Sequence, residues 1–443
     1  MKAHMTNAAY GVLDYAAYPF GMLVVAPIVL RHLGVAEYGM WTVATAAVST
    51  GGIVASGFGD ANIQHVAALR GSGDRHAVGS AVRCMIGINM ALGTVLALAG
   101  LLAAPAAARH VAGADGALAR ECLVSLRIAS VLMLVRALES VTISTQRAFE
   151  RYGAAVRISI GVRLLTLVSA ALLALAGHGT AAIMEATAIF WVVGTAAQFV
   201  RLRQFLGVVS FWPEFDRKTA RALFGTGTYS WLQTVAGVVF GQVDRLLLGV
   251  SLGAVAVASY ALCVQMAQPI FGLAASGLHF LFPYLSGRVG SIAPAELRLT
   301  LRRAFLCNVL LVGGGTAALL GFGNAMLQAW AGPAVAQTAA PIFSLIVIGS
   351  ALQGLGVTGT YALMAMRHFR TVAWVGIGGG VAMLLAMWRL MPVDGVHGLA
   401  LARLGYGLFS LLLYVPLLRG LAVGAATREA TVGHGSLEEV PQR

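Results

Sequence analysis

Charged residues are scarce in this sequence. Only 11% of its 443 residues are Asp, Glu, Lys or Arg, whereas soluble domains carry about 25%. Hydrophobic residues make up 58%, and the mean hydropathy is +0.82. A chain this long and this apolar cannot cover its surface with polar groups in water. The composition therefore excludes a soluble globular protein and requires lipid as the solvent.

Motifs for catalysis, metal binding and nucleotide binding are also missing. Neither HExxH nor GxSxG occurs, and no glycine-rich stretch has the Gly-Lys-Ser/Thr ending of a phosphate loop. The cysteines form no CxxC pair, and no two histidines have metal-ligand spacing on one helix face. The sequence therefore predicts no catalytic centre, no metal, no cofactor and no disulfide framework. The cysteines are Cys84, Cys122, Cys263 and Cys307.

Lysine is nearly absent, although the net charge is +13. The basic residues, almost all arginine, lie singly or in small clusters between apolar runs. No long basic tract or aromatic-interleaved patch is present, which argues against nucleic acid as a partner. This distribution is typical of the basic cytoplasmic loops of a membrane protein.

Long uncharged runs dominate what remains. A membrane-spanning helix needs about 20 apolar residues, and residues 38–59, 84–108 and 222–243 contain no Asp, Glu, Lys or Arg. Residues 304–366 are also uncharged, and a turn at residues 330–333 divides them into two spans. The runs are too long for strands and do not alternate. We expect an all-α integral membrane protein with about twelve transmembrane helices. The expected helices are 8–31, 38–58, 77–104, 121–143, 154–177, 180–201, 226–250, 255–283, 304–326, 339–363, 371–390 and 395–418.

The expected helices form two lobes of six. The longest connection lies near the middle of the chain, and its basic and apolar residues separate at helical spacing, which predicts a short interfacial helix there. A Leu-Gly pair followed by Tyr occurs after the first helix, at Leu33-Gly34, and after the seventh, at Leu252-Gly253. Such repeats are typical of transporters. The predicted parts are an N-terminal lobe at 1–205, a cytoplasmic linker at 206–225, a C-terminal lobe at 226–418 and a cytoplasmic tail at 419–443.

Orientation follows from the Lys and Arg residues of the loops and helix ends. With the N-terminus inside, twenty of them fall on the cytoplasmic side and four outside, and the other six lie within spans. Positive charge is concentrated on the cytoplasmic side of membrane proteins. We therefore expect both termini to be cytoplasmic.

Charges within spans are the strongest indicators of function, because each costs about 2.5–3.5 kcal/mol on insertion scales. Arg136 and Glu139 lie three residues apart and share a helix face. They form either a structural ion pair or a cationic cavity lining whose charge is partly balanced. Arg163 is deeply placed, whereas Arg83 and Arg127 lie nearer helix ends, where snorkelling to the interface accounts for them.

The acidic residues within spans are candidates for ion coupling. They are Asp14, Glu185 and Asp244, besides Glu139. Asp14 binds a proton or Na⁺, or instead pairs with a neighbouring arginine. Asp244 and Arg245 are adjacent and point about 100° apart on a helix. At least one of these two side chains should therefore reach another helix or a cavity.

Four stretches resemble the bacterial lipid-linked oligosaccharide flippases, the Wzx-type polysaccharide transporters of the multidrug/oligosaccharidyl-lipid/polysaccharide exporter superfamily. They are RHLGVAEYGMW at 31–41; GFGD at 57–60 with ALRG at 68–71; TQRAFERY at 145–152; and DRLLLG at 244–249, continuing through Leu252-Gly253 to Tyr260. Their order and spacing follow that family from the N-terminus to just past the middle of the chain.

The resemblance implies two lobes around a central cavity in the bacterial inner membrane. It implies movement of an undecaprenyl-pyrophosphate-linked sugar unit between leaflets for O-antigen, capsule or exopolysaccharide, with membrane lipids and polysaccharide assembly proteins as further partners. Arginine binds phosphate oxygens in a bidentate fork, so a cavity with surplus arginine suits a pyrophosphate. The candidate substrate-binding residues are Arg136, Arg163, Arg245, Arg403 and Glu139.

Two other functions remain open. A multidrug-extrusion antiporter shares the frame, but cationic drugs favour an acidic cavity. A membrane glycosyltransferase or polysaccharide polymerase usually needs a sizeable outer loop, and the longest one here is about residues 105–120. The helix number also falls short of the fourteen expected of lipid II flippases, which argues against that relative.

Overall fold

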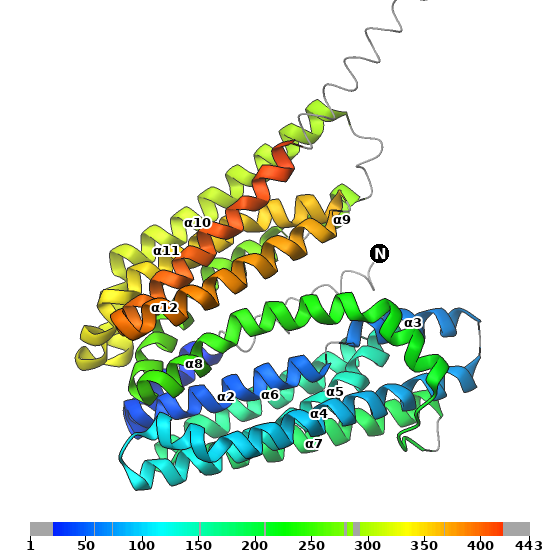
Figure 1. Ribbon diagram of the computed structural model, residues 1–443, viewed down its shortest axis with the longest axis horizontal. Coiled ribbons are helices and arrows are strands. Elements are labelled where there is room, and N and C mark those ends of the chain that lie inside the picture. The colour runs from blue at the N-terminus through cyan, green and yellow to red at the C-terminus, as the bar shows by residue number, and fades with distance from the viewer. Residues whose placement is uncertain are drawn as a thin grey trace, which may run out of the picture. The chain divides into compact units, whose positions relative to one another are not determined.

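The computed structural model describes residues 21–56, 58–72, 74–149, 152–207, 210–278, 281–286, 293–366 and 368–419. Within these residues the chain is almost entirely helical and contains no strand (Figure 1). Seven of the described helices are long and apolar enough to cross a membrane. The expected all-α membrane fold is confirmed.

The helices of the first half begin with a short one at Gly21–Leu33. It is followed by α2 (Val35–Ser56), α3 (Gly59–Ser72), α4 (Arg75–Ala112), α5 (Gly116–Ala148), α6 (Tyr152–Leu175) and α7 (Thr180–Leu206). The second half contains α8 (Arg217–Leu278), α9 (Leu281–Ser286), α10 (Pro294–Ala331), α11 (Pro333–Ala365), α12 (Phe369–Ser410) and the 3₁₀ turn η1 (Leu411–Leu413).

Glycines with positive φ separate helices that follow one another closely. Gly34 (φ 86°) lies between the first helix and α2, and Gly332 (φ 87°) lies between α10 and α11. Pro333 then occupies the first position of α11, where its missing N–H costs nothing. The turn predicted at residues 330–333 is therefore confirmed.

Two of the long helices contain a break. Gly253 (φ 81°) divides α8 into two arms, and Gly395 (φ 56°) divides α12 in the same way. Because only glycine adopts such angles without strain, these positions set where one predicted span ends and the next begins. The pairs of spans predicted at 226–250 and 255–283, and at 371–390 and 395–418, correspond to these arms.

The predicted short interfacial helix in the linker is not a separate element. Residues 210–216 are irregular, and α8 begins at Arg217 and continues without a break to Gly253. The helical spacing near residue 217 was therefore the start of the long helix itself. Apolar patterning does not distinguish these cases, because both place basic residues beside an apolar stripe.

The start of α7 is stabilised by two other helices. Its N-cap residue Gly179 offers no side chain. Instead, Glu37 of α2 accepts hydrogen bonds from the Thr180 backbone N–H (2.8 Å) and hydroxyl (3.1 Å), and Glu121 of α5 accepts from Ala181 N–H (3.0 Å). Carboxylates at a helix N-terminus satisfy free N–H groups and complement the helix dipole.

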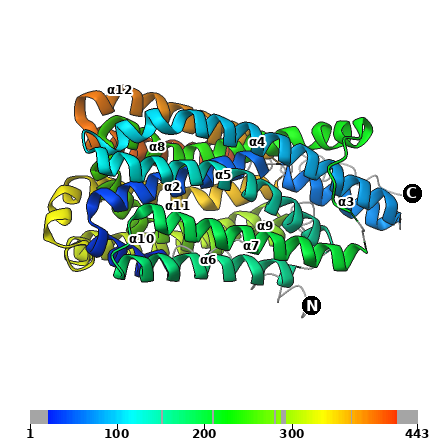
Figure 2. The same cartoon turned by 90° about the horizontal axis from the view of Figure 1, so that it is seen from below.

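The chain divides into two compact units. The first contains residues 1–266 and 326–341, and the second contains residues 267–325 and 342–443. In the first unit, α5 packs against α2, α3, α4, α6 and α7, which run side by side (Figures 1 and 2). These units do not coincide with the predicted lobes, since residues 226–266 belong to the first unit. The predicted division at 206–225 stays a prediction.

Candidate functional site

The ion pair expected from sequence spacing forms within α5. Arg136 Nη1 lies 2.6 Å from Glu139 Oε2. The Glu139 side chain is 2% exposed and that of Arg136 is 22% exposed. A buried carboxylate needs such a partner, because an unpaired charge in a low-dielectric interior is costly.

Neighbouring helices enclose the Arg136 guanidinium. Its Cζ atom lies 4.1 Å from the centre of the Trp191 ring of α7, a cation–π contact. On the other side α2 approaches closely, because a Cβ added at Gly52 would lie only 2.8 Å from Arg136 Cβ. The pair therefore lies where α2, α5 and α7 meet. Sequence spacing predicted the ion pair but gave no sign of Trp191 or Gly52.

The other predicted residues of this unit are less enclosed. Arg163 lies on α6 and is half-buried, and Glu185 lies on α7 and is exposed. Asp14 falls outside the described residues. Their assigned roles in substrate binding and ion coupling rest on the sequence and stay predictions.

Asp244 of α8 is completely buried, and both of its carboxylate oxygens accept hydrogen bonds. Its Oδ2 accepts from the Tyr260 hydroxyl at 2.5 Å, and its Oδ1 accepts from the Arg245 backbone N–H at 2.8 Å. The Asp244–Tyr260 bond joins the two arms of α8 across the Gly253 break. As expected, one of the adjacent charged side chains thus reaches a different helical segment.

The Arg245 side chain is half-buried and weakly bonded. Its Nη1 lies 3.4 Å from Gln242 Oε1. Its Nε is buried and finds no acceptor among the residues that the structure describes. A guanidinium N–H without a partner is a candidate donor to an anion.

Arg403, the remaining candidate, belongs to the second unit. It lies on the second arm of α12 and is half-buried. Three residues further along this helix, Tyr406 lines a cavity of about 260 Å³ together with Gln353, Thr360 and Ser410. This cavity lies between α8, α11 and α12 and has a mostly apolar wall.

The stretches used for the resemblance contact each other in pairs. Tyr38 of the first stretch donates to Gln265 Oε1, five residues beyond the end of the fourth, at 3.1 Å. Gly39 also packs directly on the Ala254 carbonyl oxygen, with no room for a side chain. The repeated Leu-Gly and Tyr pattern was interpreted only as an internal repeat and did not predict this contact.

The second and third stretches meet at the other end of α2. Asn62, between the two parts of the second stretch, donates through Nδ2 to Ser144 Oγ at 2.7 Å, just before the third stretch, and to Thr145 Oγ1 at 3.1 Å within it. The Arg70 guanidinium lies 5.6 Å from the centre of the Phe149 ring. These residues hold α3 on α5. Packing of α3 on α5 therefore explains why these residue types occur in the second and third stretches.

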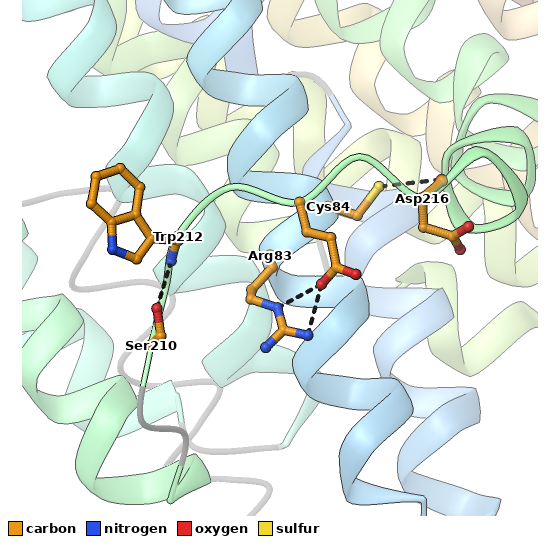
Figure 3. Close-up of polar contacts among 6 residues, drawn as sticks. Arg83, Cys84, Ser210, Trp212 and Asp216 are labelled. Carbon is orange, nitrogen blue, oxygen red and sulfur yellow. Dashed lines mark hydrogen bonds and ion pairs between the residues drawn. The ribbon is translucent and has the colours of Figure 1, made fainter.

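Arg83 of α4 forms an ion pair with the segment that precedes α8. Its Nη2 and Nε lie 2.7 and 2.8 Å from Glu214 Oε2 in the irregular segment before α8 (Figure 3). The adjacent Cys84 thiol donates to the Asp216 carbonyl oxygen at 3.8 Å. The snorkelling interpretation of Arg83 stays a prediction, and the structure adds a carboxylate partner from the segment before α8 that the sequence did not indicate.

Metal-type clusters do not occur in the described ranges: no three His, Cys, Asp or Glu side chains gather there. Polar residues of the interior form small groups, such as Arg136 with Glu139 within α5 and Asn62 with Ser144 and Thr145 between α3 and α5. The fold and these sites define a polytopic α-helical membrane protein.

A family model described as "Polysaccharide biosynthesis protein" matches residues 8–288, and the chain belongs to this family. The "Uncharacterized membrane protein EpsK" of Bacillus subtilis (strain 168) is 25% identical over 217 residues. That match covers 48% of this chain and 42% of the relative, so it spans less than half of the relative's length.

Solved structures share the fold at low sequence identity. The lipid II flippase MurJ, in an inward closed conformation, superposes with a TM-score of 0.74 at 12% identity, covering 99% of this chain and 94% of the other. A multidrug resistance MATE family transporter of the MOP superfamily, facing inward, gives 0.72 at 13% identity, covering 93% and 95%. These likenesses show that the chain shares the fold of a flippase and of a transporter.

Proposed function

We propose that the protein carries a lipid-linked oligosaccharide across the bacterial inner membrane. The substrate is an undecaprenyl-pyrophosphate-linked repeat unit, moved from the cytoplasmic to the outer leaflet for surface polysaccharide assembly. The observation that carries the proposal is the match to the polysaccharide biosynthesis family over residues 8–288. The fold likeness to a lipid II flippase supports a substrate on a lipid carrier.

Arginine in the helical interior gives the proposal a physical basis. A pyrophosphate is anionic, and arginine forms paired, charge-assisted hydrogen bonds with phosphate oxygens. Arg136 is held beside Glu139 and Trp191, and Arg245 Nε lacks an acceptor among the described residues. An anionic headgroup would offset the cost of placing these cations away from water.

A cation-coupled multidrug antiporter is the second candidate, supported by the fold likeness to a MATE transporter. Cationic substrates need acidic partners. The buried acids Glu139 and Asp244 are both already hydrogen-bonded, to Arg136 and to Tyr260. This pairing and the family match favour the anionic substrate.

Substitutions of Arg136 and Arg163 test the proposal in a flippase-deficient strain. Arg136→Ala and Arg163→Ala should each lower surface polysaccharide roughly tenfold or more, because a hydrogen bond to a charged group contributes about 1.5–3 kcal/mol. Lysine keeps the charge but not the fork, so Arg→Lys at either position should retain partial transport.

Arg127→Ala is the matched control, because Arg127 also lies on α5 but is exposed. It should support normal surface polysaccharide, and membrane abundance of every variant is measured by immunoblot. Normal polysaccharide from both alanine variants, at normal abundance, would show that these arginines do not hold the substrate. Failure of the wild-type protein to complement in any strain tested, with drug resistance gained instead, would favour the antiporter.

A further inference from the structure

A second cavity lies in the second unit, between the second arm of α8, α9 and α10. Its volume is about 450 Å³, within the range of roughly 300–1,000 Å³ usual for small-molecule sites. None of the residues assigned to transport above lines it. We refer to it as the α8–α10 groove.

The lining changes from polar to apolar along α10. Thr300, Arg303, Cys307 and Leu311 all line the groove, and their spacing of three or four residues places them on one helix face. Thr300 and Leu311 are roughly 16 Å apart along the axis, at 1.5 Å per residue. Leu273 and Leu278 of α8 complete the apolar wall.

The groove opens on a surface that suits lipid. Leu306 and Leu310 beside it on α10 are 50% and 76% exposed. The segment Ala295–Ala331 has the length and hydropathy of a membrane span, with only 11% of its most apolar window buried. In a membrane protein, such an exposed apolar helix face lies against acyl chains.

Two polar groups of the groove lack partners in the described part of the chain. Arg303 is exposed and forms no ion pair there. Asn308 is 1% exposed, and its Nδ2 donates to Gly354 O (2.9 Å) and Thr358 Oγ1 (3.0 Å). Its Oδ1 is buried at the groove wall and receives no hydrogen bond from any described residue. The groove thus offers one cation, one buried acceptor and an apolar channel.

We propose that the α8–α10 groove binds an anionic phospholipid of the surrounding bilayer whose headgroup carries a hydroxyl. Arg303 binds the phosphate, because a guanidinium matches phosphate oxygens. Asn308 Oδ1 accepts a hydrogen bond from the headgroup hydroxyl, and an acyl chain lies along Leu278 and Leu311. The site is separate from the transported substrate.

Cys307 provides a direct measurement on the wild-type protein. It is exposed and lines the groove, whereas Cys84, Cys122 and Cys263 are buried. The rate of Cys307 labelling by a membrane-permeant maleimide is measured in phosphatidylcholine vesicles containing increasing amounts of phosphatidylglycerol. Labelling should slow as phosphatidylglycerol rises, and Cys307→Ser should abolish labelling.

The neighbouring arginines supply a matched pair of variants. Arg303→Gln should weaken protection by phosphatidylglycerol roughly tenfold, as expected for loss of a charge-assisted hydrogen bond. Arg302→Gln should leave it unchanged, because Arg302 is exposed but does not line the groove. Equal labelling rates in pure phosphatidylcholine verify that both variants are folded.

Three outcomes would overturn the proposal. The first is labelling that ignores phosphatidylglycerol. The second is equal loss of protection in both arginine variants, which would reveal only a general surface charge. The third is protection by undecaprenyl phosphate but not by phosphatidylglycerol at the same mole fraction, which would assign the groove to the substrate carrier.

Discussion

Single residues hold distant parts of this sequence together through buried polar contacts. Asp244 and Tyr260 are both completely buried, and their 2.5 Å hydrogen bond closes the two arms of α8 onto each other. Each carboxylate oxygen of Asp244 accepts a hydrogen bond, from the Tyr260 hydroxyl and from the Arg245 backbone N–H. The pair therefore has a structural role that any coupling role would have to share.

Removal of the tyrosine hydroxyl should destabilise the protein. Tyr260→Phe leaves one oxygen of a buried carboxylate without this donor, at a cost of about 1–3 kcal/mol. We expect a lower thermal unfolding temperature for the detergent-purified protein. Tyr406→Phe is the control, because no described residue hydrogen-bonds to Tyr406. An equal shift in both variants would contradict a specific role for the Asp244–Tyr260 bond.

A transport assay distinguishes an ion-coupling role of the predicted acids from a purely structural role. If Asp244 or Asp14 carries the coupling ion, replacement by Asn should abolish the dependence of transport on the proton or Na⁺ gradient. Transport that keeps its full ion dependence in both Asn variants would leave Glu185 as the last of the predicted acids.

Residue-level prediction from sequence succeeded where partners share one helix. Arg136 and Glu139 are three residues apart, so helix geometry alone places them together. The contacts of Arg136 with Trp191 and of Arg83 with Glu214 join different elements. Their formation depends on how those elements pack, which periodicity within one segment does not contain.

Pairs of helices in the first unit approach each other through glycine. The start of α2 lies so close to α8 that a Cβ at Gly39 would overlap the Ala254 carbonyl oxygen. At such a position the backbone of α8 cannot give way as a flexible side chain would. This contact holds the first turns of α2 against the start of the second arm of α8.

A methyl group at this contact should be costly. Gly39→Ala should destabilise the protein by about 1–3 kcal/mol, the usual cost of overpacking a close contact. Gly161→Ala is the matched control in α6, where a Cβ would meet nothing within 4 Å; it should be neutral or stabilising, because alanine favours the helix by up to about 1 kcal/mol. Thermal unfolding followed by circular dichroism compares the two. Equal unfolding temperatures for the Gly39→Ala and Gly161→Ala variants would contradict the prediction, because they would show that α2 and α8 can move apart at Gly39 without loss of stability.

At the element scale, apolar runs predicted where spans lie but not where helices end. The helix α4 begins at Arg75 and ends at Ala112, beyond the expected 77–104 on both sides. Its ends are set by local chemistry: Asp74 accepts a hydrogen bond from Ala77 N–H, and Gly113 adopts a positive φ. Hydropathy predicts which residues are apolar enough to lie in the bilayer. It does not predict where the helix ends, because the helix continues until a capping residue terminates it.

The whole molecule should have both ends of the chain in the cytoplasm. Twenty of the thirty Lys and Arg residues fall on that side in the predicted topology, and four fall on the other. Reporter fusions after Lys2 and Arg419 measure this directly. A reporter active only in the cytoplasm should be active at both positions, and activity of an outside-only reporter at either one would overturn the topology.

The fold comparison shows that the number of predicted helices does not separate this chain from the fold of lipid II flippases. The sequence argued against a lipid II flippase because fewer than fourteen spans were expected, yet the chain superposes on 94% of MurJ. The same helical frame occurs in a MATE family transporter as well as in a lipid II flippase. Substrate identity therefore has to be argued from side chains, since the frame does not encode it.

The capping of α7 by Glu37 and Glu121 has a consequence for synthesis. Both carboxylates belong to helices that leave the ribosome before α7 does, so acceptors for its first N–H groups already exist when it emerges. A permuted chain that began with α7 would reverse this order. Its first helix would enter the bilayer with its leading amides unsatisfied until the helices carrying residues 37 and 121 arrived. The natural chain order thus lets α7 insert where acceptors for its first N–H groups are already present.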